Sequence, residues 1–152
     1  MLPPIILCID DRPQMLNLRK KSLELLGYHV ETATNAASAM KAAATLAVAV
    51  VMLDYKLEGM DAQAVAYQLK QRFPSLPIVL LSAYSEMPET LLWLVDEYVM
   101  KSEPVERISG VINKFVPASK IKPYSEGISK RLSAQYKGIA SVSRKLSVSM
   151  VW

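Results

Sequence analysis

The feature that most constrains the fold is a fivefold alternation between short apolar runs and longer segments with helical spacing. The predicted strands are Ile5–Ile9, His29–Thr32, Val48–Leu53, Ile78–Leu81 and Glu97–Met100. Strands that alternate with helices predict a parallel sheet joined by right-handed crossovers. Because most of these runs are apolar throughout, helices should cover both faces of the sheet. We therefore expect an α/β domain with a doubly wound, five-stranded parallel sheet.

The segments between these runs carry start and stop signals for helices. Proline favours the first helical turn, where its missing N–H costs nothing, and Asn and Asp side chains cap exposed N–H groups. Gly27 is a plausible C-cap for the first helix. The predicted helices run from Pro13 to about Leu26, from Asn35 to about Leu46, from Asp61 towards Phe73, from Pro88 through Leu92 and from Pro104 to about Phe115.

Charge divides the chain into two parts. Residues 1–116 carry 11 Lys/Arg and 13 Asp/Glu, whereas residues 117–152 carry 7 Lys/Arg and only one acid, Glu126. We expect a mildly acidic domain over 1–116 and a basic, Ser-rich tail over 117–152. Apolar residues recur every three or four positions after Pro123, which would suit an amphipathic helix. Two glycines and five serines favour a loose tail instead, and both interpretations stay open.

Composition argues against membrane insertion and disulfide bonding. The longest apolar run, Leu46–Leu53, has eight residues and is far too short to cross a bilayer. The N-terminal apolar stretch lacks a preceding basic residue, which disfavours a secretory signal. Cys8 is the single cysteine, so it has no internal disulfide partner. A cytoplasmic location fits these features best.

Polar residues follow four of the five predicted strands. Asp10 and Asp11 follow the first strand, Asp54 the third, Ser82 the fourth and Lys101 the fifth. The carboxyl ends of parallel strands share one edge of the sheet, where ligands of such folds bind. Each residue alone has an ordinary explanation as a turn, a cap or a solvated side chain. Together they predict three carboxylates, a hydroxyl and an ammonium in one crevice.

This donor set points to magnesium-assisted phosphoryl chemistry. Neighbouring carboxylates repel one another and favour a cation, and an all-oxygen site suits Mg²⁺ better than Zn²⁺. His29 and Cys8 provide too few ligands for a zinc site. A metal between a carboxylate and a phosphoryl oxygen would neutralise charge, and a lysine and a hydroxyl would hold the other oxygens. The absence of a GxxxxGK or GxGxxG loop argues against direct nucleotide binding.

These motifs resemble those of the response-regulator receiver family of two-component signalling, over about residues 4–116. The matching segments are Ile9-Asp10-Asp11, Leu53-Asp54-Tyr55, Leu81-Ser82-Ala83 and Tyr98-Val99-Met100-Lys101. The resemblance implies a flavodoxin-like (β/α)5 fold with strand order 2-1-3-4-5. It also implies a signalling protein that catalyses only its own phosphorylation and dephosphorylation, and not a classical enzyme.

The resemblance assigns the reaction to particular residues. Asp54 would be the phosphoacceptor, assisted by Lys101 and Ser82. Asp10, Asp11 and Asp54 would hold Mg²⁺ together with the backbone carbonyl of Lys56.

It also assigns a switch and a solvent path. Ser82 and Tyr98 would be the switch pair. Lys56 and Tyr84, two residues after Asp54 and Ser82 respectively, would border the path of attacking water and slow the loss of the phosphoryl group. The usual proline after the lysine is absent, since Ser102 follows Lys101.

Three functions remain in competition. The first is a stand-alone receiver that accepts a phosphoryl group from a histidine kinase or phosphotransfer protein. It would signal to a downstream protein, or to a second copy in a homodimer, through the face of helix 4, strand 5 and helix 5. The second is a nucleic-acid-associated transcriptional regulator acting through the basic tail, which 36 residues without a recognisable helix-turn-helix disfavour. The third is a magnesium-dependent phosphohydrolase, for which no second acid/base or substrate cap is evident.

Overall fold

The computed structural model describes residues 4–116, so the predicted basic tail lies outside the described residues. Five parallel strands form one sheet in the order β2-β1-β3-β4-β5. The elements are β1 Ile5–Ile9, α1 Pro13–Leu25, β2 His29–Ala33, α2 Ala36–Thr45, β3 Val48–Asp54, α3 Ala62–Arg72, β4 Ile78–Ser82, α4 Glu89–Leu92, β5 Glu97–Met100 and α5 Val105–Phe115. The predicted doubly wound fold and its strand order are confirmed.

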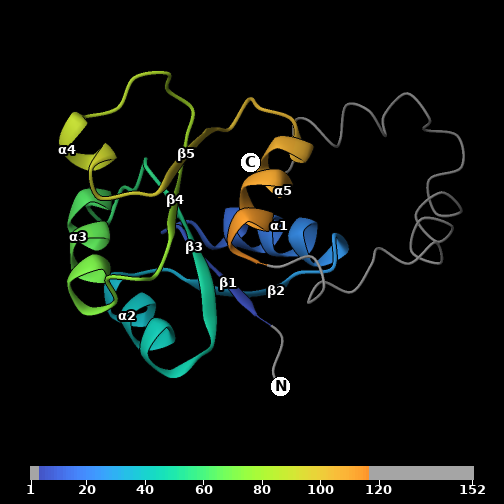
Figure 1. The fold of residues 1–152 in the computed structure, drawn as a ribbon, viewed down its shortest axis with the longest axis horizontal. Helices are drawn as coiled ribbons and strands as arrows, with labels where there is room; N and C mark the ends of the chain where they lie inside the picture. Colours follow the sequence, from blue (N-terminus) through green and yellow to red (C-terminus); the bar gives the residue numbers. More distant parts are fainter. Residues whose placement is uncertain (1–3, 117–152) are drawn as a thin grey trace, which may run out of the picture.

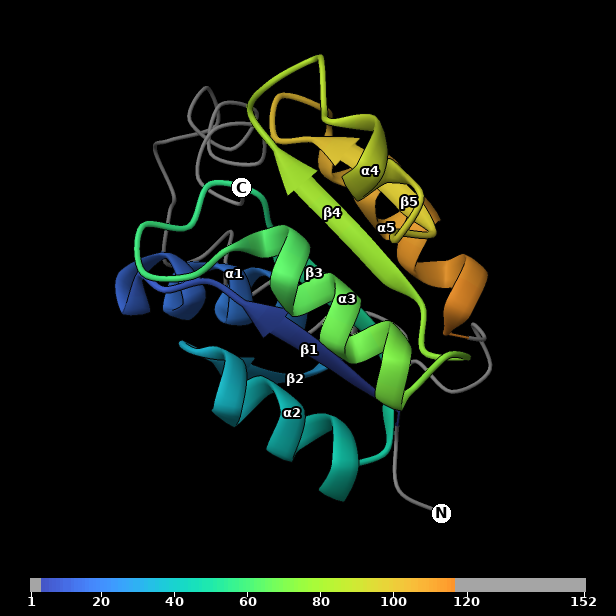
Figure 2. The same ribbon diagram turned by 90° about the vertical axis from the view of Figure 1, so that its left-hand side faces the viewer.

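Helices cover both faces of the sheet, with α1 and α5 on one side and α2, α3 and α4 on the other (Figures 1 and 2). Side chains alternate along each strand, which gives two apolar cores. Ile6 and Cys8 of β1 belong to the core under α1 and α5, whereas Leu7 and Ile9 belong to the core under α2 and α3. All four are fully buried. The apolar character of the strands therefore follows from burial on both faces, as expected.

The predicted helix signals operate in the structure. Asn35 Oδ1 accepts a hydrogen bond from the backbone N–H of Ser38 at 2.8 Å, and Asp61 Oδ1 accepts one from Gln63 at 2.9 Å. Gly27 follows α1 with a φ of 94°, a left-handed conformation that glycine adopts without a steric penalty. These caps fix the starts of α2 and α3 and the turn into β2.

A buried tyrosine ties the α1–β2 turn to α5. The Tyr28 hydroxyl donates to Asn113 Oδ1 at 2.6 Å and lies 3.0 Å from Ser109 Oγ. Burial raises the pKa of Tyr28, although both hydrogen bonds partly offset that effect. The contact joins residues more than 80 positions apart and fixes α5 against the sheet.

Helix α4 is a single turn, and the apolar run that contains it is divided between core and solvent. Leu91 is 1% exposed and Leu94 and Val95 pack beside the α2–α3 core, whereas Leu92 is 41% and Trp93 81% exposed. Within residues 4–116, none of the helices has the length and apolar character needed to cross a membrane.

Candidate functional site

The carboxyl ends of the central strands bring the predicted acids together. Asp10 follows β1 directly, and its backbone N–H donates to the carbonyl of Ala33 at 3.2 Å. Asp54 is the last residue of β3, which pairs with β1 and β4. Asp10 and Asp54 are both completely buried and Ser82 is 1% exposed. Such buried polar groups need partners, and the site supplies them.

Lys101 reaches Asp54 from the other side of the site. Its Nζ lies 2.6 Å from Asp54 Oδ2, and its backbone N–H donates to the Ser82 carbonyl at 2.7 Å. The lysine side chain is 16% exposed. A charge-assisted hydrogen bond of this length between largely buried groups is among the stronger polar contacts in a protein.

Asp10 and Asp54 are electrostatically coupled. Burial and then the contact with Asp54 raise the pKa of Asp10. At Asp54, burial acts in the same direction but is outweighed by the contacts with Asp10 and Lys101, so the pKa of Asp54 is lowered. A lowered pKa favours the ionised form of Asp54, which is the state a nucleophilic carboxylate requires.

Asp11 is directed partly towards the loop after β3. Its Oδ2 accepts hydrogen bonds from the backbone N–H groups of Glu58 at 2.5 Å and Gly59 at 2.6 Å. Its Oδ1 is buried and has no hydrogen-bond partner. The acid pair is thus divided, because Asp10 joins Asp54 while Asp11 holds the β3–α3 loop.

Two arginines complete the site, and neither was among the predicted site residues. Arg12 Nη2 lies 3.3 Å from Asp54 Oδ2, and Arg12 Nε lies 3.4 Å from Asp10 Oδ1. Arg19 of α1 is 1% exposed and approaches the same two acids, with Nη1 3.7 Å from Asp10 Oδ2 and Nη2 3.6 Å from Asp54 Oδ2. One signal was visible in the sequence, since Arg19 shares the apolar stripe of α1 with Leu16 and Leu23.

The acid residues fit a magnesium ion in donor type but are not arranged as a closed cage. Among residues 4–116, no three acidic, histidine or cysteine side chains gather closely enough to form a metal-binding group. The donors are nevertheless oxygens, as Mg²⁺ prefers, and the buried Asp11 Oδ1 lacks a hydrogen-bond partner. Because an unpaired buried oxygen is costly, a cation beside Asp11 and Asp10 would satisfy it.

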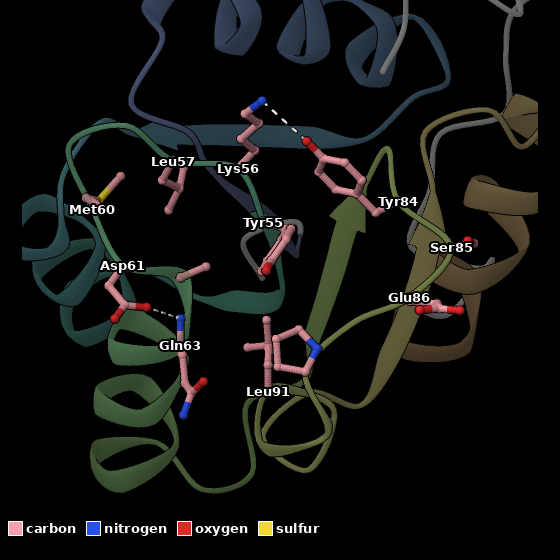
Figure 3. Close-up of a pocket in the computed structure, with 12 residues that line it drawn as sticks. Tyr55, Lys56, Leu57, Met60, Asp61, Gln63, Tyr84, Ser85, Glu86 and Leu91 are labelled. Carbon is pink, nitrogen blue, oxygen red and sulfur yellow. Dashed lines mark hydrogen bonds between the residues drawn. The ribbon is translucent and has the colours of Figure 1, made fainter.

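A lysine and a tyrosine meet beside the site. Lys56 Nζ donates to the Tyr84 hydroxyl at 3.3 Å and lies 5.9 Å from the centre of the Tyr84 ring. The Lys56 backbone N–H also donates to Asp54 Oδ1 at 3.1 Å. Figure 3 shows this hydrogen bond among the residues that line a pocket. The volume of the pocket is about 870 Å³. The pocket is lined by Tyr55, Lys56, Leu57, Met60, Asp61, Ala62, Gln63, Tyr84, Ser85, Glu86, Pro88 and Leu91.

Backbone contacts connect the predicted switch residues. Ser82 Oγ accepts a hydrogen bond from the Tyr84 N–H at 3.0 Å, and the Tyr98 hydroxyl donates to the Tyr84 carbonyl. Burial, followed by the charge of Glu103, raises the pKa of Tyr98, which remains a neutral donor. Tyr84 therefore links the end of β4 to the aromatic side chain of β5.

A five-stranded sheet in this order, with an acid pair, a single Asp, a Ser and a Lys at its carboxyl edge, is the arrangement of a signalling receiver domain. The chain belongs to the response regulator receiver domain family, whose model matches residues 6–113.

The similar proteins include bacterial regulators. The probable transcriptional regulatory protein TcrX of Mycobacterium tuberculosis is 30% identical over 109 residues, which cover 70% of this chain and 47% of TcrX. The response regulator TrrA of Thermotoga maritima, crystallised in complex with Mg²⁺–BeF, has 31% identity and a TM-score of 0.68 over 74% of this chain and 99% of that one. TrrA in complex with the histidine kinase ThkA matches at 31% identity with a TM-score of 0.66, over 74% and 97% of the two chains. The chain spans about half the length of the curated relatives that it matches.

Proposed function

We propose that Asp54 accepts a phosphoryl group in a magnesium-dependent reaction and that the domain passes its phosphorylation state to a partner. The observation that carries the proposal is the Lys101 ammonium, 2.6 Å from a completely buried Asp54 carboxylate. A buried carboxylate whose lowered pKa keeps it ionised can act as a nucleophile, and an adjacent cation can neutralise the incoming phosphoryl group.

Each residue has a part in the reaction. Asp54 Oδ attacks the phosphorus of the donor while the bond to the donor's leaving group breaks. Lys101 holds one phosphoryl oxygen and the Ser82 hydroxyl donates to another, so that charge is balanced where it develops. Mg²⁺, held by Asp10, Asp11, Asp54 and the Lys56 carbonyl, would neutralise phosphoryl charge when bound.

Lys56 and Tyr84 are proposed to prolong the phosphorylated state. Their contact lies beside Asp54, where water must approach to hydrolyse an acyl phosphate. A side chain over this approach excludes water from the phosphorus. We expect self-dephosphorylation on a time scale of about minutes or longer. Loss of the phosphoryl group within seconds would contradict this role.

The signal is proposed to leave through the face of α4, β5 and α5. Phosphorylation adds about −1.5 to −2 charges at Asp54. Movement of Ser82 towards the new oxygens would disturb its bond to Tyr84 and, through the Tyr84 carbonyl, the position of Tyr98. Such a contact chain can bias a two-state equilibrium at the surface that carries the exposed Trp93. A downstream protein, or a second copy of the chain, would read that surface.

A histidine kinase or a phosphotransfer protein is the proposed donor. TrrA forms a complex with the histidine kinase ThkA. The similarity to TrrA covers 74% of the present chain. Residues 1–116 would form the unit that receives the phosphoryl group. The basic tail over 117–152 would be an appendage with a separate role.

The names of several relatives favour one alternative, a transcriptional regulator whose basic tail contacts nucleic acid. The tail carries 7 Lys/Arg against one acid. Binding to duplex DNA with a steep dependence on salt concentration would support this function. Absence of binding at low salt would exclude it.

The main test is phosphorylation with a small phosphodonor, acetyl phosphate, with and without Mg²⁺. Intact mass should show one phosphoryl group on the wild-type protein in Mg²⁺ and none in EDTA or in the Asp54→Ala variant. Beryllofluoride should change the fluorescence of Trp93, measured in a Trp152→Phe background. An unlabelled wild type, or equal labelling of Asp54→Ala, would refute the proposed function.

A further inference from the structure

The acids of the site are held between two guanidinium groups, one exposed and one buried. The Arg12 side chain is 42% exposed and contacts Asp10 and Asp54 from the solvent side. The Arg19 side chain is 1% exposed and contacts the same two acids from within the domain. Both arginines approach Asp54 Oδ2, the oxygen that also accepts from Lys101.

The position of Arg19 follows from the sequence of α1. Leu16, Arg19 and Leu23 are spaced by three and four residues, so they share the face of the helix that packs on the sheet. All three are nearly inaccessible to solvent. Arginine cannot lose its proton in a protein, so its charge is permanent. A permanent charge in this position requires the buried carboxylates as counter-ions.

The acids at the centre of the site already have cationic partners without a metal. Asp10 and Asp54 contact three cations, Arg12, Arg19 and Lys101, whereas Asp11 accepts from backbone N–H groups of the β3–α3 loop. The acids therefore do not present a net negative charge to an incoming cation. Arg12 also contacts Asp10 Oδ1 and Asp54 Oδ2, which are oxygens that a cation shared by these two acids would use.

We propose that Arg12 and Arg19 are the counter-ions of Asp10 and Asp54 when no metal is bound. A divalent cation must then displace Arg12 while Arg19 stays in place. The inference rests on the proposed function, because it concerns the same magnesium site. Arg12 can leave since 42% of its side chain is exposed, whereas withdrawing Arg19, which is 1% exposed, would open the core under α1. The site is thus ordered before metal arrives, and its affinity for Mg²⁺ is reduced by two positive charges.

The test is the dissociation constant of Mg²⁺, measured by titration calorimetry on the full chain without a phosphodonor. Arg12→Gln should bind Mg²⁺ about tenfold more tightly than the wild type, because the guanidinium that competes for the Asp10 and Asp54 oxygens is removed. Arg19→Lys should stay within about twofold of the wild type, because it keeps the charge. Arg19→Met should bind more tightly than Arg19→Lys. Arg72→Gln, an exposed arginine at the end of α3, is the matched control and should leave the constant unchanged.

An unchanged or weaker constant in Arg12→Gln would overturn the proposal. Arg12→Gln alters an accessible side chain, so it gives this answer whether or not Arg19→Met folds. Equal constants for Arg19→Met and Arg19→Lys would show that Arg19 acts only as a packing residue.

Failure of the inference and failure of the proposed function are separable. If the wild type binds Mg²⁺ and is phosphorylated while the Arg12→Gln constant does not move, only the counter-ion proposal falls. If the wild type neither binds Mg²⁺ at millimolar concentrations nor accepts a phosphoryl group, the proposed function falls as well.

Discussion

Replacing the proposed phosphoacceptor with its neutral isostere, Asp54→Asn, should destabilise the metal-free protein. In a site dominated by acids, loss of one carboxylate would relieve repulsion and stabilise the fold. Here Asp54 Oδ2 is approached by Lys101 at 2.6 Å, Arg12 at 3.3 Å and Arg19 at 3.6 Å. The substitution leaves these three cations with fewer counter-charges, and one of them is buried. The sign of the effect therefore reports which charge dominates the site.

The magnitude follows from two opposing contributions. Removing one partner of a buried ion pair lowers the free energy of unfolding by about 3–5 kcal/mol. The substitution also relieves the Asp10–Asp54 repulsion and the desolvation of the Asp54 charge, and both effects offset part of this loss. A net loss of about 2 kcal/mol is expected, equivalent to a fall in Tm of about 8 °C for a domain of this size. Because the contacts are buried, most of the loss should persist at high salt.

The assay is thermal and urea unfolding at neutral pH in EDTA, with circular dichroism as the signal. Glu31→Gln, at an exposed position of β2, is the control and should change the free energy of unfolding by less than about 0.5 kcal/mol. An Asp54→Asn protein as stable as the wild type, or more stable, would refute the reasoning and show that acid repulsion outweighs the three cations.

Three further predictions follow from individual contacts. Lys56→Ala and Tyr84→Ala should each speed loss of the phosphoryl group severalfold, followed by intact mass after the donor is removed, since each takes away half of the bridge beside Asp54. Tyr28→Phe should cost about 1–2 kcal/mol at neutral pH through two lost hydrogen bonds. Because the pKa of Tyr28 is raised in the folded state, its contribution is complete below its ordinary pKa of 10.0 and is lost as pH rises through the raised value. Urea unfolding in alkaline buffers should therefore show a steeper loss for the wild type than for Tyr28→Phe, and equal slopes would contradict this. Burial raises the pKa of the Cys8 thiol to about 12, so an aromatic disulfide reagent should modify it only at the rate of unfolding, and rapid labelling of native protein would contradict its burial.

The strands and helices could be predicted because local signals and burial agree throughout the domain. Five apolar runs gave the strands to within one residue, and Asn35, Asp61 and Pro104 marked helix starts that the structure retains. The meeting of Asp54 with Lys101 could also be predicted, because residues at the ends of parallel strands share an edge whatever the loops do. These inferences required only periodicity and chain direction.

Other parts of the site could not be predicted, because they depend on how helices and loops are placed in space and the local sequence pattern does not determine this. Whether Arg19 reaches Asp54 depends on how α1 is placed over the sheet. Asp11 was expected beside Asp10 at a metal. In the structure Asp11 Oδ2 accepts hydrogen bonds from the N–H groups of Glu58 and Gly59, and these contacts depend on the path of the β3–α3 loop. Trp93 directly follows α4 and is 81% exposed, which an apolar run alone does not indicate.

The strand order places the two coupled acids and the lysine in regions of unequal local stability. Asp10 and Asp54 sit at the ends of β1 and β3, each held by neighbours on both sides, whereas Lys101 follows β5, a four-residue strand at the border of the sheet that pairs with β4 alone. Peripheral strands open more readily than central ones. Brief fraying of β5 would thus withdraw the lysine from its carboxylate while the acids keep their places, so Asp54 can lose the ammonium that contacts it for a moment without unfolding of the domain.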